Sequence, residues 1–221
     1  MRLARRTALG VLGAALMPVH AQARNLTIAA ASDLRFTLDE AMRAFRAVHA
    51  DARIEVVYGS SGKLATQIRH GAPFDVFLSA DREFADALHR DGFAAGAPRL
   101  YARGHLVAWS TDASLGRLPL ADLVRDARVQ RFAIANPEHA PYGRRAVEAL
   151  RSQGQWDAVQ PKLVLGENIA QAVQFVQTGA AQAGLVALSL SLVLAPALAG
   201  KGAYTRVPEA WHSPLEQSMV I

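Results

Sequence analysis

Short hydrogen-bond donors stand at four points of the chain where an apolar run gives way to an amphipathic one. These points are residues 29–33 with Ser32, residues 58–63 with Ser61, residues 136–143, and residues 166–169. At the start of a helix the first backbone N–H groups lack a helical partner, and a Gly/Ser turn leaves further N–H groups accessible. The four segments therefore predict a crevice that is rich in hydrogen-bond donors.

Catalytic and metal-binding interpretations of these residues are weaker. The turn at residues 59–62 is too short for a phosphate-binding loop of the Walker type, and Lys63 occupies the place of the last glycine of a nucleophile elbow. A secreted hydrolase that uses Ser61 with a remote histidine such as His139 stays open as an alternative. No two of the seven histidines stand three or four residues apart, and the chain has no cysteine, which excludes thiolate chemistry. We expect a protein that is not an enzyme.

The charge of the chain argues against a nucleic-acid partner. The 221 residues carry 24 Lys+Arg and 19 Asp+Glu, a formal charge of +5. Residues 1–23 contain Arg2, Arg5 and Arg6 and no acid, so the rest of the chain has 24 − 3 = 21 basic residues against 19 acidic ones. A remainder at +2 lacks the excess of basic residues that binding to nucleic acid requires.

Residues 1–23 read as a secretory signal peptide. Their arginines precede an apolar stretch at residues 8–19, and Ala21-Gln22-Ala23 supplies small residues at a cleavage site. A membrane anchor is the alternative, but the stretch is shorter than the roughly 20 residues that cross a bilayer as a helix. The Arg5-Arg6 pair leaves the twin-arginine route open beside the general secretory route. The localisation that follows is periplasmic.

Apolar periodicity predicts that strands and helices alternate along the remaining chain. Strands are expected at residues 26–30, 54–58, 74–78, 106–109, 132–135, 163–165, 184–187 and 217–221, and helices within 34–48, 64–68, 82–88, 142–151 and 169–177. Ser32 is expected as the N-cap of the first of these helices. The pattern predicts two α/β lobes, each with a mostly parallel sheet flanked by helices. Residues 24–104 form the first lobe, residues 105–212 the second, and residues 213–221 a returning crossover strand.

Four sequence runs resemble the periplasmic molybdate-binding proteins of ABC transporters. The runs are AAASDL at residues 29–34, GSSGKLATQI at 59–68, GAPFDVFLSAD at 71–81 and NPEHAPYG at 136–143. The resemblance covers nearly the whole chain after residue 23, in order. It implies the type II periplasmic-binding-protein fold, in which two lobes joined by a hinge close on the ligand in the cleft between them.

The resemblance also assigns a ligand and its contacts. It implies hydroxyl donors at Ser32 and Ser61 and backbone N–H donors at Tyr142 and Ile169, with the molybdenum of the oxyanion as the metal that these residues hold. A tetrahedral dianion needs such donors, and neutral ones suffice. Tungstate should bind as well, and no separate cofactor is expected. The implied partner is an ABC-transporter permease, and the protein should be a monomer. Another oxyanion such as sulfate is the alternative ligand.

Two features depart from the family pattern. Many relatives place a tyrosine hydroxyl on the ligand from a strand end of the second lobe, where this chain has Ala187. The Tyr142 hydroxyl is a candidate to replace that donor; the alternative is that it lies over the lobe surface in water. The sequence also ends at Ile221, within an expected strand, where the family continues with helices of the first lobe.

The signal-peptide interpretation predicts the N-terminus of exported protein. Because cleavage is expected after Ala23, the mature chain should begin at Arg24. N-terminal sequencing of periplasmic material tests this, and exported protein that still begins at Met1 would contradict it.

Overall fold

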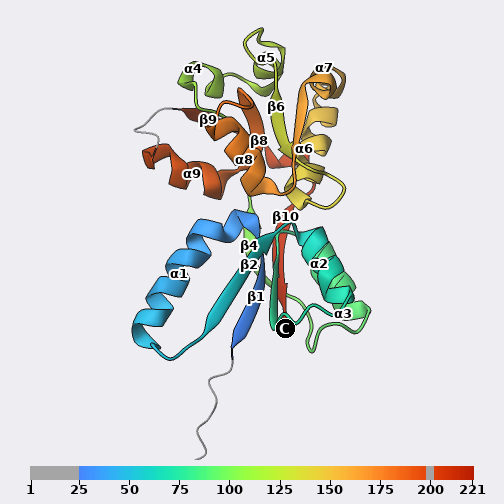
Figure 1. Cartoon of the computed structure of the whole chain (residues 1–221). Coiled ribbons are helices and arrows are strands. Elements are labelled where there is room, and N and C mark those ends of the chain that lie inside the picture. Colours follow the sequence, from blue (N-terminus) through green and yellow to red (C-terminus); the bar gives the residue numbers. More distant parts are fainter. Residues whose placement is uncertain (1–24, 198–201) are drawn as a thin grey trace, which may run out of the picture.

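The chain folds into two α/β lobes, one above the other in Figure 1, each with a five-stranded sheet. The computed structural model describes residues 25–197 and 202–221, so the predicted signal peptide at residues 1–23 lies outside the described residues. Two segments pass between the lobes, from residue 104 to 106 and from 206 to 215. The two-lobed α/β fold predicted from periodicity is confirmed.

The first sheet has the strand order β2-β1-β3-β10-β4. Its strands are β1 (Leu26–Ala31), β2 (Ile54–Gly59), β3 (Val76–Ser79), β4 (Arg99–Gly104) and β10 (Leu215–Val220). β1 pairs in parallel with β2 and β3, whereas β10 pairs antiparallel with both β3 and β4. Four of the five strands therefore run in one direction, and only β10, which returns from the second lobe, opposes them.

The second sheet repeats this plan with the order β7-β6-β8-β5-β9. Its strands are β5 (Leu106–Ser110), β6 (Phe132–Ala135), β7 (Leu163–Gly166), β8 (Ala183–Ala187) and β9 (Ala203–Arg206). Here β5 is the antiparallel strand, between β8 and β9. In both lobes an antiparallel strand thus adjoins a segment that crosses between the lobes.

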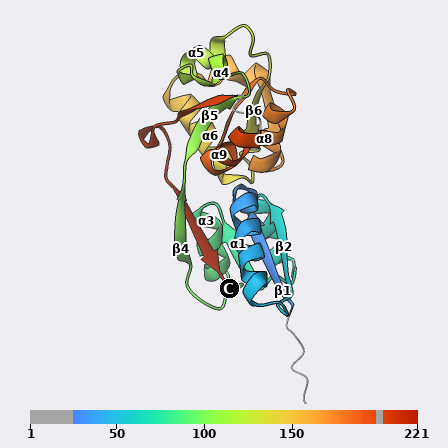
Figure 2. The same cartoon turned by 90° about the vertical axis from the view of Figure 1, so that its left-hand side faces the viewer.

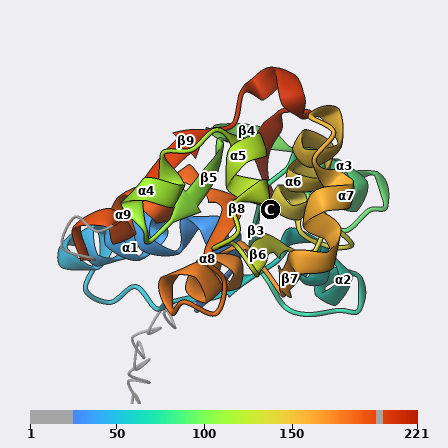
Figure 3. The same cartoon turned by 90° about the horizontal axis from the view of Figure 1, so that it is seen from above.

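Helices cover both faces of each sheet, as Figures 1 and 3 show. Along the first lobe these are α1 (Arg35–Val48), α2 (Ser61–Arg69) and α3 (Arg82–Arg90), with a short 3-10 turn at Ser32–Leu34. The second lobe carries α4 (Ala113–Gly116), α5 (Leu120–Arg125), α6 (Pro141–Ser152), α7 (Trp156–Val159), α8 (Ile169–Gln177) and α9 (Leu188–Ala197). Further 3-10 turns lie at Gln160–Lys162 and Glu209–Trp211.

The strand β4 was not among the predicted elements, which included no strand between residues 78 and 106. Its sequence, RLYARG, has no alternation of polar and apolar residues, and all six residues are exposed or half-buried, as expected for an edge strand. Figure 2 shows β4 beside β10 where the two rise toward the second lobe. The two strands that lead to the crossing segments are thus hydrogen-bonded neighbours.

The apolar core is much larger in the second lobe than in the first. The main cluster includes Trp109, Phe132, Leu150 and Leu185, all fully buried, while the first lobe has a separate small cluster around Leu64 and Phe77. Helix α1 has the predicted apolar face but no buried residue, and Phe45 and Val48 on it are 41% and 78% exposed. No helix in the described part of the chain is long and apolar enough to span a membrane.

This asymmetry predicts that the first lobe opens more readily than the second. Amide hydrogen exchange depends on local opening, and a small core lowers its free-energy cost. We expect the amides of α1 and β2 to exchange faster than those of β6 and β8 in the native protein. Equal protection of both lobes, measured by mass spectrometry on peptides from each, would contradict this inference.

Candidate functional site

All four donor-bearing segments meet at one cavity between the lobes. It is lined by Ala31, Ser32, Asp33, Gly59, Ser60, Ser61, Ala80, Ala140, Pro141, Tyr142 and Ile169. The carboxyl ends of β1, β2, β6 and β7 lead into this region, and α2, α6 and α8 begin at it. The sheet topology therefore aims the N-termini of three helices of nine or more residues at one point.

The first lobe contributes two buried hydroxyl groups. Ser61 Oγ accepts a hydrogen bond of 2.9 Å from the Ala80 backbone N–H, which leaves its own proton to donate. Ser32 Oγ donates to Asn168 Oδ1 at 3.1 Å and accepts from the Ala170 N–H at 3.3 Å, so it joins the lobes. The expectation that Ser32 caps the first helix is wrong, because α1 starts three residues later and Ser32 bonds across the cleft instead.

The second lobe contributes backbone donors at two helix starts. Pro141 occupies the first turn of α6, where a missing N–H costs nothing, and the Tyr142 N–H follows it. A methyl group on Gly143 would overlap the carbonyl oxygen of Ala135, so glycine lets α6 begin directly against β6. At α8, Asn168 caps the helix by accepting the Gln171 N–H at 3.1 Å, and Ile169 is the first helical residue.

The cavity is small, and the hydrogen-bond donors that line it are uncharged. Its volume is about 10 Å³, and the described lining contains no lysine, arginine or histidine. Lys63 and Glu167 form an ion pair across the rim, with side chains 50% and 58% exposed. Helix dipoles, N–H groups and hydroxyls thus favour an anion without a formal countercharge in the lining.

The hydrolase alternative placed His139 beside Ser61, and the structure does not bring them together. His139 Nδ1 is 2.8 Å from Ser60 Oγ instead, while Ser61 is bonded to Ala80. Burial and the nearby Lys63 lower the pKa of His139. Among the described residues no carboxylate hydrogen-bonds the other ring nitrogen, so the third member of a catalytic triad is not in place.

The Tyr142 side chain lies at the back of the cavity, toward the crossing segments. It is 2% exposed, so the alternative of a hydroxyl over the lobe surface in water is wrong. The hydroxyl donates to Asp33 Oδ2 at 3.3 Å, and Gln217 Nε2 donates to the same carboxylate oxygen at 2.5 Å. Burial raises the pKa of Asp33 to about 6, against the lowering effect of these hydrogen bonds. Ala187 is fully buried and presents only a methyl group.

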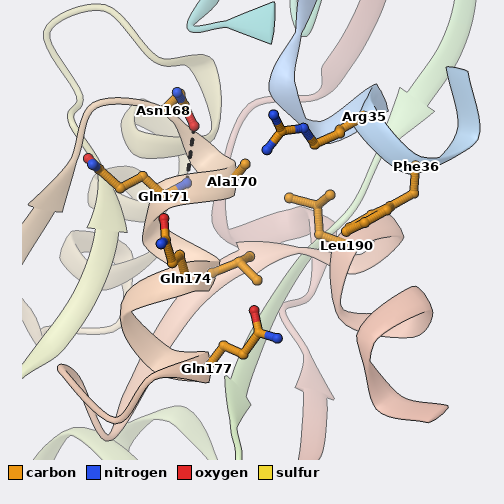
Figure 4. Close-up of a pocket in the computed structure, with 9 residues that line it drawn as sticks. Arg35, Phe36, Asn168, Ala170, Gln171, Gln174, Gln177 and Leu190 are labelled. Carbon is orange, nitrogen blue, oxygen red and sulfur yellow. Dashed lines mark hydrogen bonds between the residues drawn. The ribbon is translucent and has the colours of Figure 1, made fainter. Parts of the chain in front are cut away.

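A larger groove of about 380 Å³ lies beside the cavity, and Figure 4 shows its lining. Arg35 and Phe36 of α1 face α8 and Leu190 of α9 across it. Its α8 wall carries the amide side chains of Gln171, Gln174 and Gln177. Asn168 lines this groove and accepts a hydrogen bond from Ser32 of the smaller cavity, so one hydrogen bond links the linings of the two spaces.

The structure therefore brings together Ser32, Ser61, Tyr142 and Ile169, which the sequence analysis selected. Their role as ligand donors stays a prediction. Sequence reasoning missed Asp33 and Gln217. The only local signal for Asp33 was its place directly after Ser32.

The chain matches a known family over nearly all of its described length. The model of the family described as bacterial extracellular solute-binding protein matches residues 26–221. The molybdate-binding protein ModA of Rhodobacter capsulatus is 37% identical over 171 residues, which cover 76% of this chain and 64% of that protein, slightly less than two thirds. That of Azotobacter vinelandii is 36% identical over 211 residues, covering 95% and 82%.

A solved structure agrees in fold with most of the chain. The periplasmic molybdate-binding protein of Azotobacter vinelandii superposes with a TM-score of 0.80 at 30% identity, covering 89% of this chain and 85% of that one. Both the sequence and the three-dimensional arrangement are therefore similar to proteins of this kind.

The raised pKa of Asp33 predicts that the stability of the protein depends on pH. Its folded pKa of about 6 exceeds its ordinary value of 3.8, so the stability that it contributes is full below pH 4 and is lost as the pH rises through 6. The free energy of unfolding of the wild type, relative to that of Asp33→Asn, should fall by about 2 kcal/mol between pH 4 and pH 7. Urea titrations at both values measure this, and a constant difference would contradict it.

Proposed function

The chain belongs to the family of bacterial extracellular solute-binding proteins, and we propose that it binds molybdate with high affinity in the periplasm and delivers it to an ABC importer. Tungstate, a dianion of nearly the same size, is a second ligand in this proposal. The relatives named above are binding proteins rather than enzymes, and we infer the same for this chain.

One observation carries the proposal: hydroxyl and N–H donors from both lobes line a single buried cavity. Ser32 and Ser61 come from the first lobe, and Tyr142 and Ile169 start helices of the second. The oxygen atoms of a tetrahedral dianion accept hydrogen bonds in several directions, which donors from two lobes can satisfy together. The helix N-termini add favourable partial charge.

Binding requires an exchange of hydrogen bonds in the cavity. The Ser32 hydroxyl now donates to Asn168 Oδ1, and it would turn its proton to the oxyanion instead. The Ser61 hydroxyl needs no such exchange, because Ser61 uses only its acceptor for the Ala80 N–H. A cavity of about 10 Å³ has room for about one water, so the lobes would also move apart slightly to admit the ligand.

Selectivity follows from the types of group in the lining. Most groups of the lining are donors, which disfavours a ligand that itself carries a proton, such as hydrogen phosphate. The lining contains one carboxylate, Asp33, whose Oδ2 already accepts hydrogen bonds from Tyr142 and Gln217 and whose Oδ1 is buried. Sulfate carries the same charge as molybdate, and cavity size has to separate the two. Sulfate stays the alternative ligand for this reason.

A calorimetric titration with molybdate, tungstate, sulfate and phosphate tests the proposal directly. We expect tight binding of the first two and weak or undetectable binding of the others. Sulfate that competes as well as molybdate would favour the alternative ligand. An ester-hydrolysis assay tests the hydrolase alternative, and turnover that depends on Ser61 would contradict a pure binding function.

The substitution Ser61→Asp should abolish oxyanion binding. A carboxylate there replaces a donor by an acceptor and adds a like charge beside the ligand, a repulsion of several kcal/mol in a partly dehydrated site. Calorimetry should show at least about a hundredfold weaker binding of molybdate. Ser32→Ala removes one charge-assisted hydrogen bond and should weaken binding about ten- to a hundredfold.

The matched control is Ser114→Asp, which adds the same charge at an exposed residue of helix α4, at the far end of the second lobe. It should bind as the wild type does. Circular dichroism and thermal melts establish that each variant is folded. A folded Ser61→Asp protein that keeps wild-type affinity would refute the assignment of Ser61.

A further inference from the structure

The two lobes meet at a close backbone contact directly beside the proposed ligand cavity. The Gly62 N–H, in the first turn of α2, donates to the His139 carbonyl oxygen at 2.9 Å, and Gly62 is buried. Gly62 follows Ser61 in the first lobe, and His139 precedes Ala140 in the second. Because Ser61 and Ala140 both line the cavity, this contact lies one residue from the lining in each lobe.

The two backbones leave no room for a side chain at this point. A methyl group on Gly62 would lie 2.7 Å from the His139 carbonyl oxygen, 3.0 Å from its Cα and 2.9 Å from the ring edge of Phe84. Nonbonded carbon atoms pack at about 3.5–4 Å. The Phe84 ring can turn aside, whereas the backbone of the other lobe cannot. Gly62 is helical and has no positive φ, so the approach of the second lobe, rather than backbone conformation, requires glycine here.

The loop that carries His139 is held firmly within the second lobe. Asn136 accepts the Ala140 N–H on its carbonyl oxygen at 2.9 Å and the Glu138 N–H on its side-chain oxygen at 3.0 Å. The Asn136 N–H donates to the Gly166 carbonyl oxygen at 2.8 Å, which ties the loop to the end of β7. These three hydrogen bonds oppose a retreat of the loop from the first lobe.

Helix α2 is anchored equally well within the first lobe. Leu64 and Ala65, which follow its first two residues, are buried in the core of this lobe. Ser60, the N-cap residue, makes no side-chain cap to its own helix, and its hydroxyl lies 2.8 Å from His139 Nδ1 instead. The start of α2 therefore takes partners from the second lobe where a helix commonly uses its own cap.

We propose that Gly62 and His139 form a closure stop: they set how closely the lobes approach around a bound oxyanion, and hence the size of the cavity. A ligand drives a two-lobed binding protein toward its closed arrangement, and the lobes touch in this structure. At the closure stop, rigid backbone meets rigid backbone. An anion smaller than the cavity cannot draw the donors of both lobes closer, which disfavours sulfate.

This inference rests on the proposed function and names residues that give its cavity a defined size. The substitution Gly62→Ala tests it. The new methyl group meets the His139 backbone before closure is complete, so the donors of the two lobes should reach the ligand less well. Calorimetry should show about ten- to a hundredfold weaker binding of molybdate and of tungstate.

The melting temperature without ligand separates this effect from a general loss of stability. Alanine forms helices better than glycine, so α2 itself should tolerate the change and the ligand-free protein should melt no lower than the wild type. A ligand-free Gly62→Ala protein that melts clearly lower would assign this glycine to the fold of the first lobe and overturn the inference.

Two control variants locate the obstacle. Gly96→Ala makes the same change at an exposed position of the first lobe, where a methyl group meets no atom within 4 Å, and it should bind as the wild type does. Phe84→Leu removes the ring that the new methyl group would also touch. In that background Gly62→Ala should weaken binding by the same factor. Loss of the effect there would place the obstacle at Phe84 instead of His139.

Crystal structures of the molybdate complexes measure the contact itself. In the wild type the Gly62 nitrogen and the His139 carbonyl oxygen should stay within hydrogen-bond distance, and in Gly62→Ala they should lie farther apart. A wild-type complex in which these two atoms are separated would overturn the closure stop. Unchanged affinity of Gly62→Ala would overturn it too, as would improved binding of sulfate by this variant.

Failure of the proposed function gives a different result. In that case the wild type itself binds neither molybdate nor tungstate. Whichever of sulfate and phosphate the wild type does bind then serves as the probe for the same variants, and a wild type that binds none of the four anions would refute the closure stop together with the proposed function.

Discussion

At the starts of α2, α6 and α8, between the two lobes, some backbone N–H groups have protein partners, such as Gly62 with the His139 carbonyl. Those of Tyr142 and Ile169 have no hydrogen-bond acceptor among the described residues. A buried donor without a partner is costly, and at a helix start these donors carry the positive end of the helix dipole. The sheet topology sets their position, because β2, β6 and β7 all end at the cleft. A ligand that accepts several hydrogen bonds relieves this constraint, which links the fold to oxyanion binding.

Two kinds of interaction join the lobes, and they contribute differently to the stability of the closed arrangement. At the rim, exposed side chains form ion pairs such as Lys63 with Glu167 and Arg144 with Glu83, the latter at 2.9 Å. Water and salt screen these pairs, so they add little. Behind the cavity, Asp33 forms buried hydrogen bonds in a water-excluded place. The geometry of the cavity therefore depends more on its back wall than on its rim.

The local sequence pattern predicted elements with strong hydrophobic periodicity. It failed for an element whose strand structure depends on pairing with a distant strand. The strand β6 and the helix α8 have the predicted bounds, because a buried strand and an amphipathic helix carry strong periodicity. β4 was missed because its exposed residues gain strand structure from pairing with β10. In the site, donors at strand–helix junctions could be recognised locally. Asp33 could not, because its partners lie 109 and 184 residues away along the chain.

The position of β10 between β3 and β4 has a consequence for how the chain reaches its folded state. Residues 215–220 form hydrogen bonds to strands that are synthesised much earlier, so the first sheet stays split until nearly all 221 residues have been made. Such long-range pairing slows folding. A ribosome-bound chain would therefore remain without a complete first lobe. The order of synthesis therefore leaves β3 and β4 without the strand that lies between them until late in translation.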